Sequence, residues 1–162
     1  MQKVGCYIHI PFCQKKCYYC DFCAYMNVEH RIDNYINNLI KEIKLYQEKL
    51  SCEIDSIYIG GGTPSYIDGK YIEKIRRALE GFKIDYIKEF TIECNPNSIS
   101  KDKLLLYKDL GINRISLGVQ SFDDKVLKAI GRNHTADIAL KDIELIRSVG
   151  FDNLSFDLML NL

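Results

Sequence analysis

Apolar residues recur in this chain with two periods that alternate along its length. From Val4 to Ile10 the sequence is rich in β-branched and aromatic residues and stops at Pro11, which is typical of a strand. Between Arg31 and Lys49 the apolar positions return at helical spacing, so a helix is expected there. The chain therefore begins with a strand followed by a helix.

The same order continues to residue 159. Further strands are expected at Ser56–Ile59, Glu89–Cys94, Arg114–Gly118 and Leu154–Met159. The helices expected between them are Tyr71–Leu79, Ser100–Leu110, Asp123–Ile130 and Thr135–Val149. Strands that alternate with helices of this length indicate an α/β fold with a parallel sheet and right-handed crossovers.

About five parallel strands with polar clusters at their ends fit part of a (β/α) barrel, whose chemistry gathers at the carboxyl ends of the strands. A doubly wound sheet is the alternative. A complete eight-fold barrel takes about 250 residues, whereas this chain has 162. We therefore expect residues 1–162 to be the amino-terminal part of a truncated barrel domain, with the remaining strands and a carboxyl-terminal domain absent.

Composition and charge narrow the class of protein. Hydrophobic residues make up 47% of the chain, enough for a packed core. The 22 Lys and Arg residues balance 22 Asp and Glu residues, which disfavours nucleic acid as the main partner. No apolar run approaches the roughly 18 residues of a membrane span, and the start lacks the pattern of a signal peptide. A cytoplasmic location is the default expectation.

Four of the seven cysteines fall between residues 13 and 23. An odd number of cysteines without a secretion signal argues against a disulfide framework and for reduced thiols, some of which hold metal. Cys13, Cys17 and Cys20 share one loop after the first strand, and three local thiolates suit a metal centre with one open coordination position. The cysteines without a partner at metal spacing are expected to be buried small side chains: Cys6, Cys52 and Cys94.

Several separated motifs resemble the radical S-adenosylmethionine proteins, in particular the group of oxygen-independent coproporphyrinogen III oxidase and its haem-chaperone relatives. They are Tyr7–Cys13, the cysteine triplet, Gly60–Ser65, Ile92–Pro96, Leu117–Phe122, Gly131-Arg132 and Phe156–Leu158. These motifs cover nearly the whole chain. Their number makes the resemblance specific for the family and less specific for the member.

The resemblance implies two cofactors, a [4Fe–4S] cluster on Cys13, Cys17 and Cys20 and S-adenosylmethionine at the fourth iron. The residues that it implies for binding S-adenosylmethionine are Tyr7, Gly61, Gly62, Thr63, Glu93, Gln120, Arg132 and Asp157. Gly62 is expected to leave room for the methionyl group because it lacks a side chain. Tyr7 and His9 share one face of the first strand and are expected at the reaction centre as catalytic residues.

Taken without the resemblance, several of these residues have an ordinary structural explanation. Glu93, Gln120 and Arg132 are equally explained as solvated polar residues, and His9 as a core histidine. Asp157 lies in a strand whose neighbours should be buried, where a carboxylate needs a partner, and a structural ion pair would supply one.

Phe22 bears on which member of the family this chain resembles, because the oxidase pattern has a further cysteine at that position. Its presence favours the haem-chaperone branch, with haem bound and delivered by a full-length protein. The alternatives are oxidative decarboxylation of coproporphyrinogen III in porphyrin biosynthesis and a structural metal-binding module. The implied partners are S-adenosylmethionine, a porphyrinogen or haem, and an electron donor. In a fragment of this length, we expect the oxidoreductase-type site to be inactive or incomplete.

Overall fold

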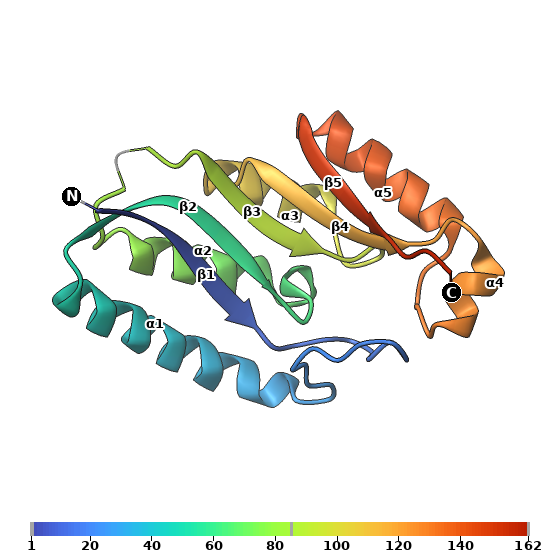
Figure 1. Ribbon diagram of the computed structural model, residues 1–162, viewed down its shortest axis with the longest axis horizontal. Coiled ribbons are helices and arrows are strands. Elements are labelled where there is room, and N and C mark those ends of the chain that lie inside the picture. Colours follow the sequence, from blue (N-terminus) through green and yellow to red (C-terminus); the bar gives the residue numbers. More distant parts are fainter. Residues whose placement is uncertain (1, 85, 162) are drawn as a thin grey trace.

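The computed structural model describes residues 2–84 and 86–161 and contains one five-stranded sheet (Figure 1). Its strands are β1 (Gln2–Ile10), β2 (Cys52–Gly61), β3 (Glu89–Cys94), β4 (Arg114–Gln120) and β5 (Asn153–Leu158). Its α-helices are α1 (Ile32–Lys49), α2 (Gly69–Leu79), α3 (Lys101–Asp109), α4 (Asp124–Ala129) and α5 (Ala136–Ser148), with short 3-10 turns at Glu29–Arg31 and Pro64–Tyr66. Each strand and α-helix that the sequence predicts is present.

Strand β2 starts earlier than the sequence predicts. Its first residues include Glu53 and Asp55, which interrupt the apolar pattern. The structure pairs Glu53 with Lys3 at 3.4 Å and Asp55 with Lys88 at 3.1 Å. These ion pairs stabilise Glu53 and Asp55 within β2, although their charges interrupt the apolar pattern that predicts a strand.

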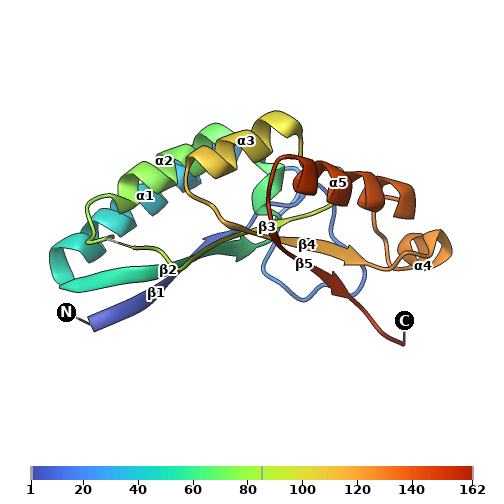
Figure 2. The same cartoon turned by 90° about the horizontal axis from the view of Figure 1, so that it is seen from above.

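Neighbouring strands of the sheet are also neighbours in the sequence. The order is β1-β2-β3-β4-β5 and every pair is parallel. A doubly wound sheet reverses its strand order at a switch point, and the described strands do not. Figure 2 shows α1, α2, α3 and α5 on the same side of the sheet. These features confirm the predicted fold class, part of a (β/α) barrel.

The hydrophobic core lies between the sheet and these helices. Alternate strand residues point into it, because successive side chains of a strand face opposite sides. Fully buried members from the strands include Ile10, Ile57, Ile59, Phe90, Ile92, Ile115, Leu117 and Val119, and those from the helices include Ile36, Ile72, Ile75, Leu104 and Ile146. This apolar layer holds the carboxyl ends of the strands in register.

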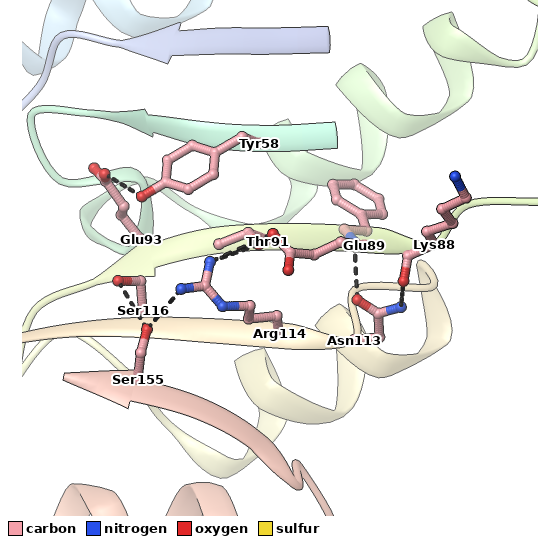
Figure 3. Close-up of polar contacts among 10 residues, drawn as sticks. Tyr58, Lys88, Glu89, Thr91, Glu93, Asn113, Arg114, Ser116 and Ser155 are labelled. Atoms are coloured by element: carbon pink, nitrogen blue, oxygen red, sulfur yellow. Dashed lines mark hydrogen bonds and ion pairs between the residues drawn. The ribbon is translucent and has the colours of Figure 1, made fainter. Parts of the chain in front are cut away.

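Side chains on the opposite face of the sheet are polar. Figure 3 shows Arg114 reaching from β4 to both neighbouring strands, with Nη1 3.2 Å from Thr91 Oγ1 and Nη2 2.9 Å from Ser155 Oγ. On the same face, the Tyr58 hydroxyl donates to Glu93 at 2.7 Å. Glu93 lies one residue before the carboxyl end of β3, so the polar side chains extend along this face to the ends of the strands.

None of the helices formed by the described residues is both long enough and apolar enough to cross a membrane.

Candidate functional site

A cavity of about 230 Å³ lies at the carboxyl ends of the strands. Its wall combines the loop after β1, the glycine segment that ends β2, and residues of β3, β4 and β5. Every site residue that the sequence predicts belongs to this wall except Tyr7 and His9. Together with Arg132, which follows α4, residues from six separate parts of the chain thus meet at one place.

The cysteine loop is held at both of its sides. On one side, Gly62 N donates to Ile10 O at 2.9 Å and Thr63 N donates to Phe12 O at 2.8 Å. On the other side, Tyr18 N donates to Ile130 O at 3.0 Å. The loop is therefore fixed between the end of β2 and the end of α4.

The three predicted ligand thiols differ in burial. Cys13 is buried, whereas Cys17 and Cys20 are partly exposed. Burial raises the pKa of the Cys13 thiol, while its hydrogen bond with Thr63 and the charge of Arg132 act in the opposite direction. The contacts that favour the thiolate therefore reach Cys13 from outside its own loop.

Within the described residues, no three His, Cys, Asp or Glu side chains lie close enough together to hold a single metal ion. Cysteines that bind an iron–sulfur cluster each bind a different iron atom, so their sulfurs stand farther apart than the ligands of one ion. The three predicted ligand thiols, those of Cys13, Cys17 and Cys20, all belong to the wall of one cavity.

The glycine segment allows two neighbouring strands and the cysteine loop to approach closely. Gly61 has a φ of +120°, a conformation that favours glycine, and a Cβ there would lie 2.7 Å from the His9 ring. A Cβ on Gly62 would lie 2.8 Å from the Phe12 carbonyl oxygen and 3.0 Å from Cys13 Sγ. The cysteine loop thus takes the space that a side chain on Gly62 would need, while Gly62 itself belongs to the cavity wall. That Gly62 leaves room for the methionyl group stays a prediction.

Arg132 and Gln120 suit a polar ligand in the cavity. The buried Nε atom of Arg132 has no hydrogen-bond partner among the described residues, and an unpaired buried donor is costly unless a ligand accepts from it. Gln120 has a φ of +70° beside an irregularity in the pairing of β4 with β5. Backbone strain of this kind collects at functional sites. Both residues belong to the same wall.

Glu93 belongs to the cavity wall and also contacts Tyr58 on the polar face of the sheet. Its Oε2 accepts from Gly61 N at 3.0 Å and its Oε1 accepts from the Tyr58 hydroxyl at 2.7 Å. Burial, followed by the neighbouring Glu93 carboxylate, raises the pKa of Tyr58, so this hydroxyl stays protonated and able to donate. Glu93 is thus held in place as an acceptor from both sides.

Tyr7 and His9 lie outside the cavity wall. The Tyr7 hydroxyl is 3.0 Å from His9 Nδ1, and His9 Nε2 is 3.2 Å from Cys23 O. The Tyr7 ring lies against Tyr58, with 6.1 Å between the ring centroids. The structure therefore places the two predicted catalytic residues beside the cavity, and Tyr7 is connected with it through Tyr58.

Two sequence-based expectations about burial are wrong. Asp157 is exposed, as are its neighbours Phe156 and Leu158, because β5 is an edge strand of the described sheet. Cys6 and Cys52 are only partly buried. They line a separate groove between β1 and α1, which the helix does not close.

Of the three cysteines that were expected to be buried, Cys94 alone is buried. Burial raises the pKa of its thiol to about 12. It also belongs to the cavity wall, where a neutral thiol is a small apolar neighbour rather than a metal ligand.

Asn95 belongs to the cavity wall but is not among the predicted site residues, although it lies within the motif Ile92–Pro96. It contacts Thr63 at 2.9 Å and Arg132 at 3.0 Å. It comes directly after β3, and this place at the carboxyl end of a parallel strand is the signal that could have identified it.

Comparisons with known proteins agree on the kind of protein that this chain resembles. A family model described as Radical SAM superfamily matches residues 7–162. The heme chaperone HemW of Lactococcus lactis is 41% identical over 155 residues, which cover 94% of this chain and 40% of the relative. The heme chaperone HemW of Bacillus subtilis is 39% identical over 161 residues, which cover 96% of this chain and 42% of the relative.

A solved structure, coproporphyrinogen III oxidase (HemN) from Escherichia coli, superposes with a TM-score of 0.89 at 30% sequence identity. The match covers 97% of this chain and 37% of that chain. This chain thus spans roughly two fifths of the length of the proteins that it matches.

Proposed function

Because this chain belongs to the radical SAM superfamily, we propose that its cavity holds a [4Fe–4S] cluster together with S-adenosylmethionine, and that it forms part of a haem chaperone. Cys13, Cys17 and Cys20 supply the three thiolates in this proposal. When bound, the cluster and S-adenosylmethionine supply one-electron radical chemistry. An electron donor and a cytoplasmic location belong to the same proposal.

One observation carries the proposal: three thiols, an unpaired arginine donor and a strained glutamine belong to the wall of one cavity. The guanidinium of Arg132 is suited to binding a carboxylate, which S-adenosylmethionine carries. Glu93, Gln120 and Asp157 offer oxygens to amino and hydroxyl groups. The tight packing of Gly61 and Gly62 against His9 and Phe12 fixes the wall against which the ligand lies.

The cluster ligands are tested by anaerobic reconstitution followed by iron and sulfide analysis. Substitution of Cys13, Cys17 or Cys20 by Ala should abolish iron binding. Cys23→Ala is the matched control, because Cys23 is an exposed thiol three residues beyond Cys20 and lies outside the cavity wall. If Cys23→Ala lost iron as completely as Cys20→Ala, the proposed ligand set would be wrong.

The haem-chaperone assignment rests on the curated relatives, of which several at 35 to 41% identity are named heme chaperones. Phe22 supports it, since this side chain belongs to the cavity wall at the place where the oxidase pattern has a cysteine. Absorbance titration of the reconstituted chain with haem is the test. A saturable change is expected once the chain is extended to the length of these relatives, and its absence there would refute the haem-chaperone assignment.

Coproporphyrinogen III decarboxylation is the second candidate, favoured by the superposition on coproporphyrinogen III oxidase. It is distinguished from the first by incubating the reconstituted chain with coproporphyrinogen III, S-adenosylmethionine and a reductant. Formation of the decarboxylated product by a chain that binds no haem would favour the oxidase.

A further inference from the structure

Asn95 connects two of the cysteines through two other side chains. Its Nδ2 lies 2.9 Å from Thr63 Oγ1, which in turn lies 3.3 Å from Cys13 Sγ. Its Oδ1 lies 3.0 Å from Arg132 Nη2, and Arg132 Nη1 lies 3.4 Å from Cys17 Sγ. A single side-chain amide thus stands at the centre of a network that ends on two sulfur atoms.

The chemistry of these groups determines the direction of each hydrogen bond. A guanidinium only donates, so the atom of Asn95 that faces Arg132 is the carbonyl oxygen. The amide nitrogen therefore faces Thr63, and because this NH₂ group also only donates, Thr63 Oγ1 accepts from it. The hydroxyl hydrogen of Thr63 is then free for Cys13 Sγ, and a thiolate sulfur has no hydrogen of its own to donate.

Packing holds the amide of Asn95 in place. Thr63 is buried, and a Cβ on Gly118 would lie only 2.7 Å from Asn95 Oδ1. The backbone N–H of Asn95 donates to Ser65 Oγ at 3.1 Å. The amide therefore has contacts at its backbone and at both ends of its side chain, which oppose a rotation that would reverse the network.

We propose that Asn95 orients Thr63 and Arg132 so that both donate hydrogen bonds to thiolate sulfurs, and that this network raises the reduction potential of the cluster bound there. The inference rests on the proposed function. Hydrogen bonds to sulfur ligands help to set the potential of iron–sulfur clusters, because they stabilise the additional negative charge of the reduced state. Asn95 and Thr63 are positioning residues in this scheme, and neither binds iron.

The test compares two substitutions of Thr63 in the reconstituted chain. Thr63→Val keeps the shape but removes the hydroxyl, so the midpoint potential should shift to a more negative value at unchanged iron content. Thr63→Ser keeps the hydroxyl and should restore the wild-type potential. Thr91→Val is the matched control, because Thr91 is a buried threonine on β3 whose hydroxyl contacts Glu89 and Arg114. The midpoint potential of the Thr91→Val chain should equal that of the wild type.

Asn95→Asp tests the direction of the network. Both carboxylate oxygens accept, so Thr63 would donate to the aspartate and no longer to Cys13, and the potential should fall. The added negative charge lowers the potential as well, so the double variant with Thr63→Val separates the two effects. If Asn95 acts through Thr63, Asn95→Asp lowers the potential less in the Thr63→Val chain than in the wild type.

The iron content of each variant is measured first. Each redox titration is then monitored by electron paramagnetic resonance. A wild-type chain that binds no iron would refute the proposed function, and this inference with it. Full iron content with equal potentials in wild type, Thr63→Val and Asn95→Asp would overturn the inference alone. If Thr63→Val binds no iron, the uncharged variant Asn95→Ala is compared with Thr63→Ser: equal potentials refute the network, and a lower potential in Asn95→Ala supports it.

Discussion

Gly62→Ala should disturb the cysteine loop, although alanine adds a single methyl group. That methyl would lie 2.8 Å from Phe12 O, 3.0 Å from Phe12 N and 3.0 Å from Cys13 Sγ. Two of these three atoms belong to the backbone, which cannot rotate away as a flexible side chain would. The loop must therefore move as a unit, together with the sulfur of Cys13.

The size of the effect follows from the contacts. Extra volume in a filled space costs about 1 to 3 kcal/mol. Phe12 O also accepts from Thr63 N at 2.8 Å, and weakening this bond adds about 1 kcal/mol. The free energy of unfolding should therefore fall by about 2 to 4 kcal/mol. For a chain of this size the melting temperature should fall by roughly 5 to 15 °C.

Thermal unfolding followed by circular dichroism measures the loss of stability, and iron analysis after anaerobic reconstitution measures the effect on the loop. Gly111→Ala is the control, because Gly111 has a φ of +86° and a methyl group added there would meet no described atom within 4 Å beyond its chain neighbours. It should lose about 1 to 2 kcal/mol from backbone strain and retain full iron binding. A Gly62→Ala chain with wild-type melting temperature and iron content would refute the reasoning.

Three further predictions concern other parts of the chain. Burial, followed by the charge of Arg132, lowers the pKa of His134 from 6.5 to about 4, so the unfolded chain binds a proton more readily between these values and stability is lost as the pH falls through them. His134→Gln should lose less stability between pH 7 and pH 5 in urea titrations, and an equal loss would contradict this. Ser100→Ala removes the hydroxyl that accepts from Lys103 N at the start of α3 and should lower the free energy of unfolding by about 1 kcal/mol, whereas an unchanged urea midpoint would argue against the cap. Edge strand β5 exposes Phe156 and Leu158, so the chain should self-associate along this edge and Phe156→Lys should reduce that association in sedimentation velocity; a monomeric wild-type chain, or association unchanged by the substitution, would contradict this.

The strands, the helices and the general place of the site could be predicted from local patterns of residues. Strand β3 was expected at Glu89–Cys94 and is observed there, because the apolar residues that define a strand are adjacent in the chain. The cysteine loop and the polar residues after the strands indicated one site for the same reason. Parallel strands bring their carboxyl ends to one edge, so a local pattern was enough to predict that edge.

The contacts among the site residues could not be predicted in this way, because they join residues that are far apart in the chain. Asn95 joins Thr63, 32 positions away, to Arg132, 37 positions away, and Arg132 reaches Cys17 across 115 positions. Whether Gly62 faces a ligand or the cysteine loop, and whether Asp157 is covered, likewise depends on what packs beside each strand. These contacts follow from the lateral order of the strands and the closure of their loops, which no local pattern of residues contains.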